Sequence, residues 1–186
     1  MKKTHIFLTL LAVALATGLL FVSCPTESKS ESKSSGPDAA LNGTWVYELD
    51  MESSTHEVAI IFNNGNYETR SDGRPGNKGT YTTSGSSLTR TTTHIHGGSY
   101  IALYPDVLDG SPTPYITLPE SQEWYTKTEV KTAVKASFPD DFGAEWKPEY
   151  DKQMDDMFAP QTVTYSVSGN TLTLGEGDHS LTLTKK

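Results

Sequence analysis

The sequence predicts an all-β protein with a helical insertion. We expect an eight-stranded antiparallel up-and-down barrel, with two helices inserted between the fifth and sixth strands. Short segments alternate apolar and polar residues with a period of two, which is typical of half-buried strands. Turns of glycine, asparagine and serine join most of these segments, which favours antiparallel neighbours. One long connection, about residues 97–161, shows helical spacing instead.

The first three strands follow one another closely. One face of the first strand collects the apolar side chains of Trp45, Tyr47, Leu49 and Met51. The second strand repeats the alternation with Val58, Ile60 and Phe62. The turn over residues 63–66 contains asparagines and a glycine, which tolerate positive φ, so we expect residues 67–70 to form the returning strand.

One hairpin pattern occurs twice. The fourth strand ends in Tyr81-Thr-Thr-Ser-Gly, and the fifth begins with Leu88-Thr. Near the C-terminus, Tyr165 and Leu172 stand in the same places, and a Gly-Glu-Gly-Asp turn then opens the last strand. Eight strands arranged in this way close into a barrel that is just wide enough for side chains or for one small ligand.

The insertion, about residues 97–161, begins with an irregular proline-containing stretch and continues with two helical patterns. Thr126 and Glu129 form a capping box, after which apolar residues follow at helical spacing: Val130, Ala133, Val134 and Phe138. A second stripe consists of Trp146, Tyr150, Met154, Met157 and Phe158. Two arrangements fit these stripes. Either the apolar faces pack on the barrel exterior or on each other, or a ligand pocket at a barrel mouth is lined by Trp124, Tyr125, Trp146 and Tyr150.

Residues 1–23 have the plan of a lipoprotein signal peptide. Lys2 and Lys3 form a basic start, and an apolar run follows from Ile6 to Val22. The small residue before Cys24 resembles a bacterial lipobox, which is cleaved and lipidated at the cysteine. A signal peptide cleaved elsewhere and a single membrane-spanning anchor are the alternatives. We expect an exported protein of the bacterial cell envelope, lipid-anchored at the outer membrane.

The remaining chain has the size and charge of one acidic domain. About 163 residues follow the leader, which is enough for one hydrophobic core. Serine and charged residues dominate residues 24–40, so we expect an acylated cysteine and a disordered tether there, and the barrel over 41–186. Without the leader, the chain has 13 basic and 23 acidic side chains. The resulting net charge of −10 argues against nucleic-acid binding. Acyl chains on Cys24, the only cysteine, would then make the membrane contact.

Three short motifs carry a resemblance to a known family. They are Gly-Thr-Trp at 43–45, Phe-Asn-Asn-Gly-Asn-Tyr at 62–67 and Gly-Thr-Tyr at 79–81. In this order, together with the paired hairpins, they resemble small lipocalin-like (calycin-type) domains of bacterial lipoproteins, over about residues 41–96 and 162–186. The resemblance implies a tryptophan that plugs one barrel end and a fold class that holds small apolar molecules. Lipocalins also carry an arginine near the last strand that closes over this tryptophan, whereas this chain ends in Thr-Lys-Lys.

Two histidines suggest a metal site. His94 and His96 share one face of the fifth strand with Leu88, which points them toward the barrel interior. Two imidazoles placed in this way can ligate zinc. His179 shares a face with Leu181 and would supply a third ligand. A polar strand end or a solvated loop explains the same residues without a metal, and we expect no cofactor.

No pattern in the chain indicates catalysis. The acidic residues Asp151, Asp155 and Asp156 have helical spacing and fit a solvated helix face. The sequence contains no Gly-x-Ser-x-Gly elbow, no phosphate loop and no His-Glu-x-x-His motif. We therefore expect that the protein is not an enzyme.

Three functions remain, of which an enzyme or metal carrier has the least support in the sequence. The first is a membrane-tethered, exported lipoprotein that acts as a non-catalytic binding module for an apolar or amphipathic small molecule. The alternative is a surface interaction protein that contacts a partner or host protein through its helical insert and has a filled barrel. Open apolar space inside the barrel favours the first function, whereas an interior filled by aromatic side chains favours the second.

Overall fold

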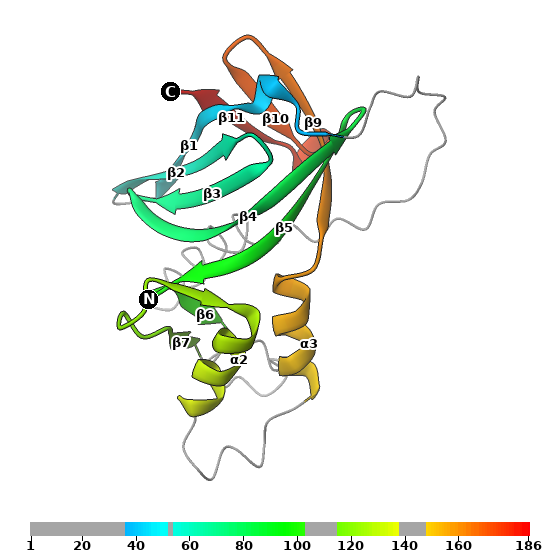
Figure 1. Ribbon diagram of the computed structural model, residues 1–186. Helices are drawn as coiled ribbons and strands as arrows, with labels where there is room; N and C mark the ends of the chain where they lie inside the picture. The colour runs from blue at the N-terminus through cyan, green and yellow to red at the C-terminus, as the bar shows by residue number, and fades with distance from the viewer. Residues whose placement is uncertain (1–35, 52–53, 103–114, 138–147) are drawn as a thin grey trace. The chain divides into compact units, whose positions relative to one another are not determined.

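The computed structural model describes residues 36–51, 54–102, 115–137 and 148–186. The leader and Cys24 therefore lie outside the described residues. The chain divides into two compact units (Figure 1). The barrel unit contains the described residues up to Thr91 and those from Pro160 to Lys186, and the insert unit contains Thr92–Ala159.

Eight antiparallel strands form the closed barrel that the sequence predicts. In chain order they are β1 (Gly43–Met51), β2 (Ser54–Asn63), β3 (Asn66–Ser71), β4 (Arg74–Ser84), β5 (Ser87–His96), β9 (Gln161–Ser168), β10 (Thr171–Leu174) and β11 (Leu181–Lys185). Each strand pairs with its neighbour in this order, β11 pairs with β1, and β4 pairs with β5. The barrel is therefore up-and-down, and its helical insertion follows the fifth strand (Figure 1).

The barrel unit is held by one hydrophobic core. Its most deeply buried side chains, at most 2% exposed, are Leu41, Trp45, Phe62, Tyr81, Leu88, Leu172 and Leu183. Phe62 and Tyr81 meet edge to face, with ring centroids 4.9 Å apart, a favoured geometry for aromatic pairs. The inward residues of the strands thus supply the core, as the period of two predicts.

The Gly-Thr-Trp motif closes one end of the barrel, which we call the Trp45 end. The indole N–H of Trp45 donates to the carbonyl of Leu41 at 2.6 Å. The Lys185 Nζ lies 5.1 Å from the centre of the Trp45 ring, as a cation over an aromatic face. Gly43 has a φ of 131°, and a Cβ there would come within 2.7 Å of the Lys185 side chain. The motif therefore favours glycine, because a φ of 131° is strained for any other residue, whereas the flexible end of Lys185 could move aside.

Ordered structure begins earlier than the sequence predicts. Residues 36–40 belong to the expected tether, yet Gly36 forms a bridge with Thr83 of β4. Asp38 caps a 3₁₀ turn (η1, Ala39–Leu41) and accepts a hydrogen bond from the Tyr165 hydroxyl at 2.8 Å. The prediction of disorder as far as residue 40 is therefore wrong for these residues, because their backbone and one carboxylate find partners on the barrel.

The described residues of the insert unit form three short strands and two helices. β6 (Tyr100–Ala102) pairs with β7 (Tyr115–Thr117), and β8 (Trp124–Thr126) pairs with the last residues of β5. The helices are α2 (Lys127–Ala136) and α3 (Pro148–Met157). The Glu129 carboxylate accepts hydrogen bonds from the backbone N–H and the hydroxyl of Thr126, at 2.8 and 2.7 Å. The capping box that the sequence predicts therefore opens α2.

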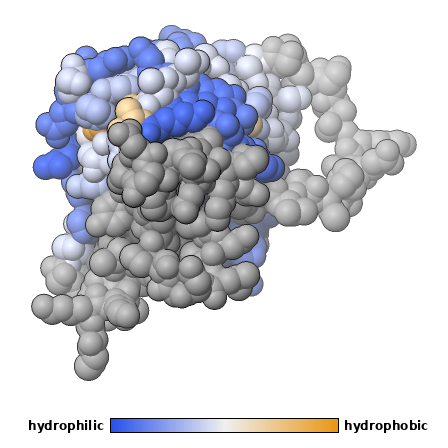
Figure 2. Space-filling model, turned by 90° about the horizontal axis from the view of Figure 1, so that it is seen from below, coloured by the Kyte–Doolittle hydropathy of each residue, from blue (hydrophilic) through white to orange (hydrophobic). Residues whose placement is uncertain are grey.

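A second core lies inside the insert unit. It joins both helices to the short strands through Ile95, Ile101, Ile116, Leu118, Tyr125, Val130, Val134, Tyr150, Met154 and Phe158. The described part of the aromatic stripe of α3 is thus buried within its own unit, which is one of the arrangements that the sequence left open. Tyr100, 66% exposed, is the only large exposed apolar side chain among the described residues. On the face that Figure 2 shows, the coloured surface is mainly hydrophilic, with small separate apolar spots.

Candidate ligand-binding site in the barrel

On β1, β2 and β11, burial inside the barrel declines away from the Trp45 end. On three neighbouring strands, the inward residues nearer that end are at most 4% exposed: Trp45, Ile60 and Leu183. The next inward residues along the same strands are only partly buried: Tyr47, Val58 and Leu181. The opposite end, where the chain leaves the barrel unit after Thr91 and returns at Pro160, we call the Gln161 end. Apolar side chains of the interior therefore remain partly accessible toward the Gln161 end.

Arg90 is a charged residue on the inward face of β5. It lies two residues after the buried Leu88 and directly opposite Gln161 of β9. Its guanidinium carbon is 5.4 Å from the centre of the Tyr67 ring. Its Nε atom is buried and has no hydrogen-bond partner among the described residues. Burial lowers the pKa of Arg90 from its ordinary value, while the nearby Tyr67 raises it. An arginine nevertheless stays protonated in proteins, so the interior contains a cation.

We did not identify Arg90 as a candidate residue from the sequence, although its position on β5 indicates an inward charge. Residues on a strand that are two apart point to the same face. Leu88 is apolar and inward, so Arg90 is a charge at an inward position. Charges at such positions are uncommon because burying them costs free energy unless they are paired.

The four aromatic candidates do not gather into one described pocket. Tyr125 and Tyr150 are 6% and 4% exposed and belong to the core of the insert unit. The Tyr125 hydroxyl donates to the carbonyl of Pro119 at 2.9 Å. Trp124 is half-buried and donates its indole N–H to Glu123 at 3.1 Å. Trp146 lies outside the described residues. Tyr125 and Tyr150 are therefore packing residues of the insert unit.

The three candidate histidines are divided between the two units. His96 packs edge to face on Trp124, with ring centroids 5.1 Å apart, and the His94 ring is hydrogen-bonded to Thr93 at 2.9 Å. His179 lies in the other unit, on an exposed 3₁₀ turn (η3, Gly177–His179). Among the described residues, no group of three His, Cys, Asp or Glu side chains is placed to hold a metal ion.

The buried face of β5 changes along the strand. Leu88 is buried in the barrel unit, whereas Ile95, seven positions along the strand, is buried in the insert unit. Residues that are an odd number of positions apart lie on opposite faces of a strand. His94 and His96 share the face of Leu88, as predicted, but they are only half-buried because the second half of β5 buries its other face.

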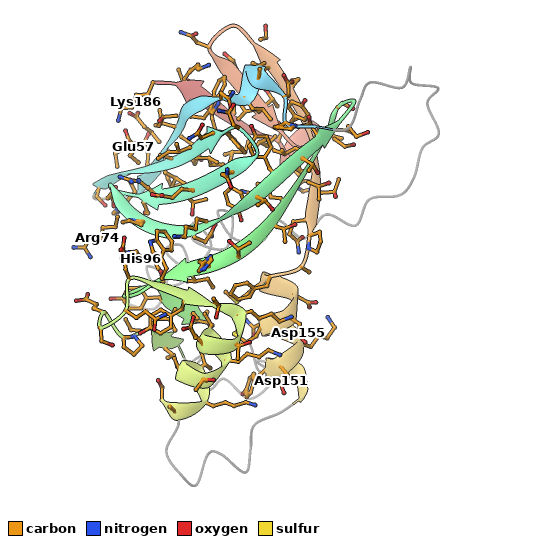
Figure 3. The ribbon with its side chains drawn as sticks, viewed as in Figure 1. Glu57, Arg74, His96, Asp151, Asp155 and Lys186 are labelled. Atoms are coloured by element: carbon orange, nitrogen blue, oxygen red, sulfur yellow. The ribbon has the colours of Figure 1, made fainter. Side chains whose placement is uncertain are left out.

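The acidic residues of α3 form ion pairs with α2. The Asp155 Oδ1 lies 2.7 Å from the Nζ atoms of both Lys127 and Lys131. Asp151 lies 3.5 Å from the Lys131 Nζ and 3.9 Å from that of Lys135. Figure 3 shows Asp151 and Asp155 on the side of α3 that faces α2. Both side chains are also solvent-exposed, at 42% for Asp151 and 49% for Asp155. The face is therefore solvated as the sequence predicts, and its ion pairs connect the helices in addition.

We expect these contacts to weaken in acid. The hydrogen bonds from Lys127 and Lys131 lower the pKa of Asp155 from 3.8 to about 2. Its stabilising effect is therefore complete above pH 3.8 and lost as the pH falls through about 2. An NMR titration of the Asp155 carboxyl should show the low pKa, and Lys131→Met should raise it. Lys152→Met, which removes the partner of Asp156, is the control. A native pKa near 3.8 would contradict the arrangement.

Comparison with known proteins does not assign this chain to a family. None of the helices in the described ranges has both the length and the apolarity that a membrane span requires. No family model, no curated protein and no solved structure matches this chain.

Proposed function

We propose that the protein is an exported, membrane-tethered lipoprotein whose lipocalin-like barrel binds an apolar or amphipathic small molecule without catalysis. The decline of burial inside the barrel carries this proposal. Trp45 and Leu183 are 0% exposed, whereas Tyr47 and Leu181, farther along the same strands, are partly accessible. Partly accessible apolar side chains on the inward face of three strands suit a small ligand, because apolar pockets bury most of a ligand's surface.

The Trp45 end supports the lipocalin-like part of the proposal. Lys185 on the last strand lies directly opposite Trp45 and holds its ammonium over the indole ring. In the lipocalin pattern an arginine near the last strand closes over the equivalent tryptophan. A lysine provides the same cation over an aromatic face, so the chain keeps the arrangement with a different side chain.

A substitution at the Gln161 end tests binding. Leu181 faces the interior and is partly buried, whereas Thr182 is exposed on the opposite face. We expect Leu181→Arg to weaken the binding of a fluorescent apolar probe at least about tenfold, because a buried charge displaces apolar contact area. Thr182→Arg is the matched control and should bind as the native chain does. Equal binding by all three chains would contradict an interior site, and so would the absence of binding to the native chain.

The anchor has its own test. If acyl chains on Cys24 hold the protein at the membrane, Cys24→Ala should move it from the membrane fraction to the soluble fraction, because the acidic body has little attraction for anionic lipid. The measurement is fractionation of cells followed by detection of the protein. Unchanged partition of Cys24→Ala would instead indicate an uncleaved apolar anchor.

One observation favours the second candidate, an interaction protein. The insert unit buries its own core, with Val130, Val134 and Met154 all at 0% exposure. It therefore has the makings of a separate recognition module. On this alternative, Leu181→Arg leaves function intact, and replacement of Thr92–Ala159 by a short linker abolishes it.

A further inference from the structure

We propose that Arg90 binds the carboxylate of a small amphipathic molecule inside the barrel. This inference rests on the proposed binding function and names the chemical class of the ligand. It starts from an observation that packing does not explain, which is a cation on the inward face of β5 whose Nε atom is buried and lacks a hydrogen-bond partner among the described residues.

The protein supplies Arg90 with an aromatic face but with no counter-charge. The Tyr67 ring lies 5.4 Å from its guanidinium carbon, and no carboxylate of the described residues pairs with it. Arg70, on the outward face of β3, shows the contrast, because its Nε donates to the Glu68 carboxylate at 2.8 Å. A buried charge without a hydrogen-bonded partner is unfavourable, so an anion that enters the barrel would gain a strong donor.

The inward positions around Arg90 are neutral. In the described part of the barrel, no Asp or Glu stands at a strand position on the inward face. Gln161 lies directly across from Arg90, and Val163 is the next inward residue of β9. Farther from Arg90, the partly accessible side chains of Tyr47 and Leu181 are apolar or aromatic. Lys185 is a second inward cation, but its ammonium lies over the Trp45 ring. Arg90 with its apolar surround therefore suits a ligand with one anionic group and an apolar body.

The charge balance favours a carboxylate over a phosphate monoester. One guanidinium compensates one negative charge, and its planar fork matches the two oxygens of a carboxylate. A phosphate monoester carries about −1.5 to −2 charges at pH 7, so part of its charge would stay uncompensated in the interior. Arg90 as a residue is only partly buried, so part of it stays accessible.

The test compares three ligands of equal chain length. Dodecanoate, dodecanol and dodecyl phosphate compete with a fluorescent apolar probe on the chain from Pro25 to Lys186, which contains every described residue. We expect dodecanoate to bind about tenfold more tightly than dodecanol, since a hydrogen bond to a charged group is worth about that factor. Arg90→Met should remove this preference, and Arg90→Lys should keep only part of it. Arg70→Met, which changes an outward arginine, should preserve it.

The other outcomes distinguish a failure of the proposed binding function from a failure of the assignment to Arg90. If neither the probe nor any of the three ligands binds the native chain, the proposed binding function fails. If dodecanoate and dodecanol bind the native chain equally well, the binding function stands and the assignment to Arg90 is overturned, whether or not Arg90→Met folds. A preference for dodecyl phosphate overturns the carboxylate assignment. A lower melting temperature of ligand-free Arg90→Met, with the preference for dodecanoate unchanged, makes the arginine structural and also overturns the inference.

Discussion

Trp45→Ala should lower the free energy of unfolding of the barrel unit by about 3–5 kcal/mol, the usual cost of removing a buried tryptophan. The side chain is 0% exposed, its indole N–H donates to the Leu41 carbonyl, and the Lys185 ammonium lies over its ring. All three contacts disappear together in the variant. The loss is a large part of the stability of a typical domain, so urea denaturation should reveal it directly.

Trp124→Ala provides the control for this experiment. Trp124 is only half-buried and belongs to the insert unit. Its removal should therefore leave the transition of the barrel unit unchanged. A loss of only a few tenths of a kcal/mol in Trp45→Ala would contradict the role of the Gly-Thr-Trp motif as the plug of the Trp45 end.

Met154→Ala should destabilise the insert unit by about 2–5 kcal/mol, because it opens a cavity in a packed core. Met154 is 0% exposed and packs in the core of the insert unit with Val130 and Tyr150. Since the barrel unit has a separate core, amide hydrogen exchange should quicken in α2 and α3 and stay slow in β1 and β2. Lys152→Ala, at a side chain that is 76% exposed, is the matched control on the same helix.

Equal acceleration of exchange in both units would contradict the separation of the two cores. A complementary experiment replaces Thr92–Ala159 by a short glycine and serine linker. Arg90 and Gln161 lie directly opposite each other on β5 and β9, so a short connection can join the two cut ends. We expect the truncated chain to keep a folded barrel, because its eight strands bury a core of their own.

The barrel could be predicted because its signal is local. Alternation with a period of two defines each strand, and turns such as Asn64–Gly65, where both residues have positive φ, join neighbours along the chain. The up-and-down order then follows from short connections. The three short strands β6, β7 and β8 escaped prediction, because three residues are too few to show an alternation.

The failures came from contacts between distant parts of the chain. The prediction that His94 and His96 point into the barrel assumed that β5 buries the same face along its whole length. The strand instead buries Leu88 in the barrel core and Ile95, on its other face, in the core of the insert unit. The role of Lys185 over Trp45 required the pairing of the first and last strands. The missing partner of Arg90 is likewise a property of the closed barrel, since only closure shows that no described side chain hydrogen-bonds its Nε atom.

Mass spectrometry of the chain from Pro25 to Lys186, purified under non-denaturing conditions from the cells that export it, tests the central claim most directly. We predict a complex with one small molecule, which denaturation releases as an amphipathic carboxylic acid. Leu181→Glu, which repels a carboxylate and removes apolar contact, should lose this molecule, and Thr182→Glu should retain it. A protein that carries no small molecule as isolated, and that takes up no apolar probe when one is offered, would contradict the account.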